Sequence, residues 1–589
     1  MSLDGLTLAA VKKELEDLLL GSRINKIYQP GKKTVLLNLR KEKSKTYNLL
    51  ISAEADSPRI HLISSKTPNP SQPPSFCMSL RKHLEGKQFK EIKQPQWERV
   101  LIFHFSGFSE GGIPEEKLMI CEIMGKHSNI ILLNSEEIIL DAAVKYSHAV
   151  SSHREVLPGK PYIPPPDQGK VNPESLNEDH FFRLIFEGDI DHKLTDILLK
   201  RIMGMGPQTC REIVIRAGLE PEITLNECGE YEISKIWQQF NEILKYIKTN
   251  NLKPTLVYDP LEEKYISFAP FDLKQYSGYK KSYFNTMNEA LEVFFESKQY
   301  LQKFKELENR LLKIIRREIK RCANKIGEHE LELKEAEDAE KFKIAGEIIT
   351  ANIFRISKGD KVLTAQNFYD PQGRDINIDL DPRLTPSQNA QRYFKKYRKA
   401  LVKRKKILEQ LDITRGELMY LESVMASIEQ ADTLEDLEEI REELTKEKYI
   451  SPSQVRQRKE KTKPEILTYR SSDGFDILVG KNNRQNDFLT FKAAKDEDLW
   501  LHTKEIPGAH VIVKRKDKGE IPPQTIVEAA MVAAYYSRGK NSANVPVDYT
   551  YRKNVRKPKG ARPGMVIYEN HKTISVTPDP EKIKQLQRI

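Results

Sequence analysis

The pattern of apolar and polar positions changes along the chain, and its first part combines one helix with several short strands. Apolar residues from Leu6 to Leu20 recur at helical spacing, which predicts an amphipathic helix. The next segments alternate apolar and polar residues between Gly or Pro breaks, as strands do: INKIYQPGKKTVLLNLR, YNLLISAEADSPRIHLI, WERVLIFHF, KLMICEIMGKHSNIILLN and EIILDAAVKY. The run LPGKPYIPPPDQGK cannot continue a helix or a central strand. We therefore predict an α+β domain over residues 1–170.

Residues 171–275 have helical periodicity and contain the run LLKRIMGMGPQTCREIVIRAGLE. In this run Gly204 and Gly206 bracket a tight turn, and Pro207 stands at the expected start of a helix. The pattern is that of a helix-hairpin-helix, whose glycine turn can present backbone N–H groups to a phosphate. Gly204 and Gly206 are therefore candidates for phosphate contact, and a hairpin that serves only for packing is the alternative.

Residues 280–450 are highly charged and contain two apolar runs whose steps are typical of a coiled-coil seam. The first arm carries Phe304, Leu307, Leu311, Ile315, Ile319, Cys322 and Ile326, and the second carries Leu401, Leu408, Leu411, Leu418, Leu421 and Met425. Turn residues and strand formers between the arms predict a small β element at residues 346–385. We expect an antiparallel coiled-coil hairpin that holds this small domain at its far end, so that the arms act as a spacer.

The last part of the chain returns to mixed structure. A basic, polar linker is predicted at residues 451–463, followed by a C-terminal α+β domain at residues 464–580. Strands are expected in DGFDILVG, DFLTFKA and DLWLHTKEIPGAHVIVK, and a helix is expected in QTIVEAAMVAAYYSRG. The predicted fold class is thus a multidomain α+β protein with a long coiled-coil hairpin between its outer domains.

The composition indicates which kind of partner the protein binds and in which cellular compartment it works. The net charge of +11 and the pI near 9.0 favour a polyanionic partner, either nucleic acid or an anionic membrane surface. The five cysteines are scattered without zinc or disulfide spacing, which fits a reducing compartment. The N-terminus lacks a signal-peptide pattern, and no window has the roughly 18 to 20 apolar residues that a membrane span requires. We expect a cytoplasmic protein without a membrane partner.

A strongly basic segment near the C-terminus has the composition of a nucleic-acid contact. Tyr549, Tyr551 and Tyr568 are interleaved with its cations, so that cations could meet phosphates while rings stack on bases. A solvated basic surface is the alternative. The cations are Arg538 and Lys540, followed by the six phosphate-contact candidates Arg552, Lys553, Arg556, Lys557, Lys559 and Arg562.

Two segments contain histidines that could serve metal binding or catalysis. In DLWLHTKEIPGAHVIV, Asp498, His502 and His510 span a Pro-Gly turn, so we expect a strand-turn-strand and no metal. In EIMGKHSN, His127 has no Ser or Cys nucleophile in a recognisable elbow and follows no phosphate-binding glycine pattern. Its neighbours Gly125, Lys126, Ser128 and Asn129 are suited to contact a phosphate or a base edge at the end of a strand, and whether Lys126 and His127 touch a phosphate stays open.

Five separated motifs, taken in order, resemble the NFACT family of ribosome-associated quality-control factors over essentially the whole chain. They are WERV with EIMGKHSN, the helix-hairpin-helix, GEIITAN, LDPRLTPSQNAQRYFKKYRK, and GKNNRQNDFLT with DLWLHTKEIPGAHVIV. The resemblance implies a monomer on the ribosome that binds a large ribosomal subunit still carrying peptidyl-tRNA. It also implies recruitment of tRNA, tRNA-Ala in bacterial members, for C-terminal tailing of the nascent chain without mRNA. Peptide-bond formation then belongs to the ribosome, so the resemblance implies no enzyme activity and no cofactor.

Two short motifs in the family's N-terminal domain are associated with tRNA engagement. One is an Asp-Arg pair, which matches Glu98 and Arg99 here, with glutamate in place of aspartate. The other is a Glu-Ile-Met triplet, which matches Glu122, Ile123 and Met124. The resemblance thus makes these five residues the candidates for tRNA binding, together with Lys126 and His127.

Two other functions are suggested by family naming and fold. Older naming suggests a fibronectin-binding surface adhesin, which would need an unusual export route because no signal peptide or anchor is recognised. The N-terminal domain and hairpin also resemble formamidopyrimidine DNA glycosylases, but Ser2 and Leu3 replace the Pro-Glu start of those enzymes and their zinc-finger cysteines are missing. The family's C-terminal motif more often has serine where this chain has Ala509, which argues against a hydroxyl role there.

Overall fold

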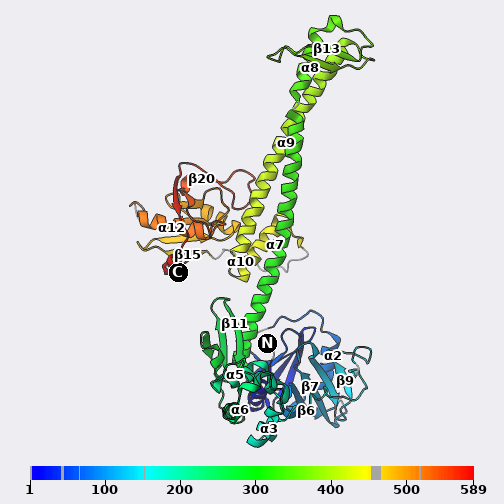
Figure 1. Cartoon of the computed structure of the whole chain (residues 1–589), viewed down its shortest axis with the longest axis vertical. Helices are drawn as coiled ribbons and strands as arrows, with labels where there is room; N and C mark the ends of the chain where they lie inside the picture. The colour runs from blue at the N-terminus through cyan, green and yellow to red at the C-terminus, as the bar shows by residue number, and fades with distance from the viewer. Residues whose placement is uncertain are drawn as a thin grey trace. The chain divides into compact units, whose positions relative to one another are not determined.

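A computed structural model describes most of the chain, and its fold divides into two compact units (Figure 1). The described residues are 3–41, 45–65, 67–109, 111–151, 153–337, 339–452, 466–515 and 519–588. Unit 1 comprises Met1–Leu301 and unit 2 comprises Gln302–Ile589. Within the described ranges, none of the helices combines the length and apolar character needed to cross a bilayer.

The centre of unit 1 is a nine-stranded antiparallel sheet with the order β4-β3-β2-β1-β5-β6-β7-β8-β9. Successive side chains along a strand point to opposite faces of the sheet, so the two faces bury different sets of side chains. The strands are β1 (Arg23–Gly31), β2 (Thr34–Arg40), β3 (Thr46–Ser52), β4 (Arg59–Ile63), β5 (Gln88–Lys93), β6 (Val100–Phe108), β7 (Pro114–Glu122), β8 (Asn129–Asn134) and β9 (Ile139–Ala142).

Each face of the β6–β8 region has its own core. On one face, Leu101 and Phe103 of β6 join the main core together with helices α1 (Gly5–Leu19) and α2 (Ser75–Leu84). On the other face, Val100 and Ile120 join a smaller core that includes Val156 from the segment after β9. The segment that follows the sheet therefore covers the face that α1 leaves open.

After the large sheet, the described part of unit 1 continues with further helices and a second sheet. The helices are α3 (Glu178–Phe186), α4 (Leu194–Arg201), α5 (Pro207–Arg216) and α6 (Glu230–Lys248). The sheet has the order β11-β10-β12 and contains β10 (Thr255–Asp259), β11 (Lys264–Ala269) and β12 (Lys280–Tyr283). The purely helical character expected for residues 171–275 is thus wrong after α6, because the short β-branched and aromatic run Thr255–Asp259 pairs with neighbouring strands.

Long helices dominate the first part of unit 2. Helix α7 (Met287–Glu337) begins in unit 1, and it packs along α9 (Pro386–Glu429) through Leu311 and Ile315 on α7 and Leu421 and Val424 on α9 (Figure 1). Two further helices are α8 (Ala339–Ala351) and α10 (Leu434–Lys446). Strands β13 (Val362–Gln366) and β14 (Asp375–Asp379) form a hairpin whose core includes Ile348 and Ile349 of α8.

The apolar positions predicted for the first arm are buried or half-buried, whereas the prediction is wrong at two positions of the second arm. Leu401 and Leu408 are 40% and 43% exposed, and the neighbouring Ile407 is buried instead. Since Ile407 and Leu408 are both apolar and adjacent, the periodicity could not distinguish which one faces the partner helix.

The C-terminal part of unit 2 is a seven-stranded sheet with the order β22-β19-β17-β18-β16-β15-β23, covered on one face by α12 (Pro523–Tyr535). Its strands are β15 (Leu467–Arg470), β16 (Asp476–Gly480), β17 (Leu499–Thr503), β18 (His510–Val513), β19 (Val545–Tyr551), β22 (Lys572–Val576) and β23 (Gln587–Arg588). Strands β20 (Val555–Arg556) and β21 (Ile567–Tyr568) form a separate pair, and α11 (Asn483–Phe488) and α13 (Pro580–Gln585) complete the domain. The predicted strand DFLTFKA is wrong, because these residues continue α11 as a π-helix, Leu489–Ala493. The predicted linker 451–463 lies outside the described residues except for Ser451 and Pro452.

Candidate nucleic-acid interface

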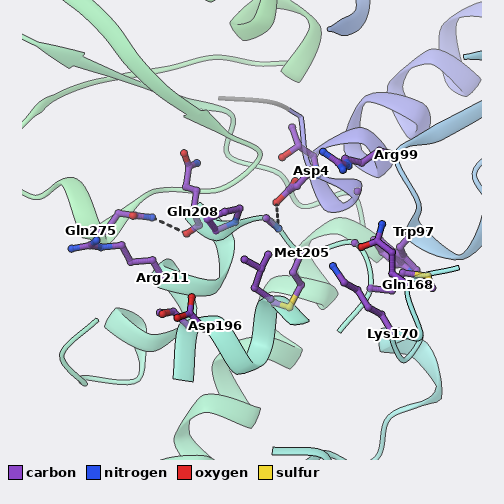
Figure 2. A pocket seen from close by; sticks show the side chains of 18 of the residues that line it. Asp4, Trp97, Arg99, Gln168, Lys170, Asp196, Met205, Gln208, Arg211 and Gln275 are labelled. Carbon is purple, nitrogen blue, oxygen red and sulfur yellow. Dashed lines mark hydrogen bonds between the residues drawn. The ribbon is translucent and has the colours of Figure 1, made fainter. Parts of the chain in front are cut away.

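Unit 1 contains a polar cavity of about 590 Å³ where several segments distant in sequence converge (Figure 2). They include the start of α1, the loop before β6, the end of the proline-rich run, the α4–α5 hairpin with the loop that follows it, and residues in and after β11. Its charged side chains carry both signs: Asp4, Glu98, Asp196 and Glu222 are acidic, and Arg99, Lys170 and Arg211 are basic. The cavity therefore unites the predicted Glu98-Arg99 pair with the predicted glycine turn.

Asp4 joins two helix N-termini within this cavity. One carboxylate oxygen accepts a hydrogen bond from the Thr7 N–H at 2.8 Å and so caps α1. The other accepts from the Gly206 N–H at 3.2 Å and from the Thr209 hydroxyl at 2.5 Å, at the start of α5. The expectation that the Gly206 N–H is open to a phosphate is therefore wrong, because the protein's own carboxylate already accepts it.

The loop before β6 is held in an unusual conformation beside this turn. Gln96 and Trp97 have φ angles of 42° and 64°, in the left-handed region that residues other than glycine rarely adopt. The Gln94 side-chain amide donates to the carbonyls of Gly5 at 2.8 Å and Glu98 at 2.9 Å, which ties the loop to α1. These contacts fix the direction in which the chain presents Glu98 and Arg99.

Two glycines make the close approach of α1, this loop and the hairpin possible. A Cβ placed on Gly5 would lie 1.8 Å from the Trp97 carbonyl oxygen and 2.7 Å from the Gly204 Cα. Gly204 itself has a φ of +80°, and a Cβ there would lie 2.8 Å from the Trp97 Cβ. Gly204 thus serves backbone packing at the cavity wall, and the predicted glycine turn is explained by this packing.

The two predicted N-terminal motifs are neighbours across β6 and β7. The Ile123 N–H donates to the Arg99 carbonyl at 2.8 Å, directly beyond the pairing of Val100 with Glu122. Arg99 and Glu98 line the cavity, whereas Glu122 and Ile123 are both 0% exposed. The expectation that the whole triplet belongs to a binding surface does not hold for the side chains of Glu122 and Ile123.

Glu122 is the centre of a buried ionic cluster. Both of its oxygens accept hydrogen bonds from the Arg154 guanidinium at 2.7 Å, and one also accepts from the Tyr162 hydroxyl at 3.0 Å. Burial raises the pKa of Tyr162, and the nearby Glu122 charge raises it further. Burial alone would lower the pKa of Arg154, but its bond to Glu122 raises it above the ordinary value. Glu122 therefore anchors the chain segment that leads into the proline-rich run.

The remaining residues of the EIMGKHSN motif are less buried than Glu122 and Ile123. Met124 is half-buried against the smaller core, and Lys126 and His127 are exposed on a short turn, Gly125–His127. Neither Lys126 nor His127 lines the cavity described above. Their predicted contact with RNA stays a prediction, on a surface next to β7 and β8.

The six predicted phosphate-contact cations of the C-terminal domain fall into two groups. Arg552 bonds Asp496, Lys557 bonds Asp487, and Arg562 contacts Glu417 and Tyr449 of the long-helix region. Among the described residues, the other three form no ion pair and are exposed; they are Lys553, Arg556 and Lys559. Only this second group is immediately free to meet a phosphate, and Arg562 is instead part of the docking of this domain.

That docking uses the predicted GKNNRQ motif against the acidic helix α10. Lys481 pairs with Asp432 at 2.7 Å, and Arg484 pairs with Glu442 at 2.8 Å. The Asn483 side chain donates to Glu443 at 3.1 Å, and burial raises the pKa of Glu443 to about 7. The motif thus holds the C-terminal domain to the helices of its own unit.

His502 and His510 of the C-terminal domain pack against each other. His510 is 2% exposed, its Nδ1 lies 2.8 Å from the Thr490 hydroxyl, and its ring lies 5.4 Å from that of His502. Burial lowers the pKa of His502 to about 4 and that of His510 well below its usual value. Asp498 instead bonds Lys514 at 2.8 Å. Across the described ranges, no cluster of His, Cys, Asp and Glu side chains is arranged to hold a metal ion.

Several cavity residues could not be found from the sequence. Asp4 had a weak signal, since it stands directly before the first predicted helix as an N-cap would. Gln168, Lys170 and Arg211 had none, because they were assigned to a domain boundary or to an ordinary helix face. These residues reach the cavity because distant segments converge in the fold, and no local sequence pattern indicates that convergence.

A polar cavity at a helix-hairpin-helix, together with a second domain that exposes cations, is a combination expected of a multidomain nucleic-acid-binding protein. Comparison with known families makes the class more specific. The model for NFACT N-terminal and middle domains matches residues 4–463, and the model for the NFACT protein RNA binding domain matches residues 465–570. The chain belongs to the NFACT family.

A relative that matches over its full length supports this assignment. The chain is 38% identical to the "Rqc2 homolog RqcH" of Bacillus subtilis, with 100% of both chains covered. It is 23% identical to the human "Ribosome quality control complex subunit NEMF", over 90% of this chain and 55% of that protein. A solved C-terminal part of a fibronectin/fibrinogen-binding protein from Streptococcus suis is 35% identical, covers 49% of this chain and 99% of that one, and has a TM-score of 0.39.

Proposed function

We propose that this protein is a ribosome quality-control factor of the cytoplasm. It binds large ribosomal subunits that still carry peptidyl-tRNA and recruits tRNA, tRNA-Ala in particular, for C-terminal tailing of the nascent chain without mRNA. The ribosome forms the peptide bonds, so the protein acts as a binding factor, as a monomer on the subunit, and is not itself an enzyme.

The observation that carries this proposal is the cavity in which Arg99, Lys170 and the α4–α5 hairpin meet, in a chain with an RNA-binding domain. A guanidinium and an ammonium beside uncharged amides suit a folded RNA, whose phosphates and base edges both need partners. The name of the human relative, which refers to ribosome quality control, supplies the physiological setting.

Arg99→Ala should separate tRNA recruitment from subunit binding. Loss of a charge-assisted contact is expected to lower the yield of C-terminal tails on a stalled reporter at least about ten-fold. Co-sedimentation with large subunits in a sucrose gradient should be retained, because the C-terminal domain and long helices are unchanged. Tails are measured by mass spectrometry of the released chain.

Arg183→Ala is the matched control, since Arg183 is an exposed arginine on α3 that does not line the cavity. It should leave tail yield and sedimentation unchanged. Equal loss of subunit binding and tailing in Arg99→Ala would contradict the division of labour. A wild-type chain that never co-migrates with stalled large subunits at low salt would refute the proposed function itself.

The exposed cations of the C-terminal domain should govern the salt dependence of RNA binding. Replacing Arg556 and Lys559 together by alanine removes two candidate phosphate contacts and should reduce the slope of log affinity against log salt by about 1.5 to 2. Lys557→Ala should change the slope less, because Lys557 already pairs with Asp487. Filter binding of ribosomal RNA between low and moderate salt measures both slopes. Equal slopes for the wild-type chain and both variants would show that these residues do not contact the RNA.

A further inference from the structure

One face of the C-terminal domain is covered by the long helices of its own unit, and we call it the docked face. The side chains that define it each lie 3.9 Å or less from a carboxylate of α9, α10 or the turn between them. These side chains are Lys481, Asn482, Asn483, Arg484, Gln485, Arg538 and Arg562. The carboxylates that they contact are Glu417, Glu422, Asp432, Asp436, Glu439, Glu442 and Glu443.

The docked face has the composition of a surface that binds RNA. Arginine, lysine and side-chain amides supply many of the protein contacts to phosphates, sugars and base edges. Arg562 also lies over the Tyr420 ring, 4.8 Å from its centre, and guanidinium groups stack on nucleic-acid bases in the same way. Carboxylates offer such a surface the negative charge and the oxygen acceptors that phosphates offer. The acidic helices therefore occupy the docked face as an internal substitute for a phosphate backbone.

The docked face is continuous with the exposed cations of the same domain. Arg556 and Lys559 are exposed, and Arg562 follows them on the same segment and lies in the docked face. Asp487 of α11, next to the GKNNRQ motif, accepts a hydrogen bond from the Gly564 N–H at 3.0 Å, which ties this segment to the motif. An RNA strand that meets the exposed cations thus arrives at the edge of the docked face, where its phosphates approach the carboxylates of the helices.

The docking depends mainly on polar contacts. In the part of the chain that the structure describes, Met565 is the one side chain of the C-terminal domain that joins the apolar cluster of α7, α9 and α10. Ion pairs and amide bonds add little net stability, because the same groups are well hydrated when two surfaces separate. Glu443 is only 2% exposed, and burying a carboxylate costs part of what its hydrogen bonds return. Docking of this composition is reversible in the presence of a competing polyanion.

We propose that the docked face is a second RNA-binding surface of the C-terminal domain, which the acidic helices occupy until RNA displaces them. Ribosomal RNA and the carboxylates of α9 and α10 then compete for the same cations. Docking weakens RNA binding by the free protein, and bound RNA weakens docking to the same extent. This inference rests on the proposed function, because it assumes that the C-terminal domain binds ribosomal RNA.

The first test weakens docking without changing any cation. Glu439→Gln together with Glu442→Gln removes the charges that face Gln485 and Arg484. The matched control, Glu409→Gln together with Glu435→Gln, removes the same net charge from exposed positions of α9 and α10 outside the docked face. Filter binding of protein-free large-subunit RNA to the full-length chain measures affinity, and thermal melting reports whether each variant is folded.

The docking variant should bind the RNA roughly three- to ten-fold more tightly than the charge-matched control, because less of the chain is held in the docked state. Adding Arg484→Gln to the docking variant should remove a large part of this gain, since the freed Arg484 then meets phosphates. Arg470→Gln in the same background is the control for loss of a guanidinium, because Arg470 lies on β15 and pairs with Asp476 of the neighbouring strand. It should leave the gain unchanged.

The second test uses the wild-type chain and so does not depend on the folding of any variant. A carbodiimide links a lysine to a carboxylate that it contacts, and Lys481 and Asp432 are 2.7 Å apart in the docked state. The Lys87–Glu115 pair of unit 1, also at 2.7 Å, serves as the internal standard. Saturating ribosomal RNA should lower the yield of the Lys481–Asp432 cross-link, relative to this standard, at least about two-fold. Mass spectrometry of the digested chain measures both yields.

Equal binding by the docking variant and its charge-matched control would overturn the inference, and so would an unchanged Lys481–Asp432 yield at saturating RNA. In either case, if replacing Arg556 and Lys559 by alanine still reduces the salt slope, docking is a permanent part of the fold and the RNA-binding role stands. If the wild-type chain binds no ribosomal RNA, the proposed function fails and the inference fails with it.

Discussion

Gly5→Ala is expected to disrupt the polar cavity and destabilise unit 1. The new methyl group would lie 1.8 Å from the Trp97 carbonyl oxygen and 2.7 Å from the Gly204 Cα. Both are backbone atoms that cannot rotate away, so the loop before β6 and the hairpin turn must separate. Overpacking of this kind costs about 3 kcal/mol or more, and the melting temperature should fall by about 6 °C or more. Differential scanning calorimetry and tRNA binding measure the two effects.

Gly278→Ala provides the matched control, because a Cβ at Gly278 meets nothing within 4 Å and its φ is not in the left-handed region. It should leave both the melting temperature and tRNA affinity unchanged. A Gly5→Ala chain that melts and binds like this control would show that the three segments do not converge as described.

Arg154→Met should have the second large effect, because it leaves the Glu122 carboxylate buried without its counter-charge. Removing one partner of a buried pair costs about 3–5 kcal/mol, since the remaining charge is desolvated and unpaired. Urea unfolding should show this loss as a lower midpoint. Adding Glu122→Gln to the same chain removes the orphaned charge and should recover a large part of the stability.

The exposed Arg183→Met serves as the control for loss of a guanidinium at the surface. It should change the free energy of unfolding by less than about 0.5 kcal/mol. If the double variant were less stable than Arg154→Met alone, Glu122 would not be the group that Arg154 neutralises.

The sequence allowed good predictions where a local pattern decides the structure. The alternation in WERVLIFHF and its neighbours predicted strands that the sheet contains, and the first apolar run predicted α1 to within one residue at each end. The mixed α+β class followed from these patterns, and the family followed from motifs that are each short but ordered along the chain. In such segments the spacing of the apolar residues follows from the geometry of the helix or strand, so the element can be predicted from that spacing.

Where the structure depends on contacts between distant segments, the sequence could not predict it. Glu122 looks like a strand-end carboxylate, and nothing local indicates that Arg154, 32 residues later, neutralises it in the interior. Lys170 ends a proline-rich run that was interpreted only as a boundary, although the last residues of that run line the polar cavity. For Arg562, a basic neighbourhood suggested phosphate contact, whereas its partners lie on the long helices of its own unit.

The shared carboxylate of Asp4 has a consequence for ligand discrimination. Helix N-termini ordinarily attract any small anion, but here a tethered anion permanently occupies the N–H group at the start of α5. Because Asp4 belongs to the same chain, its carboxylate stays close to this N–H group, and inorganic phosphate or a free nucleotide must compete with it. The N–H group of Gly206 is therefore less available to a small anion than the N–H group of an uncapped helix terminus would be.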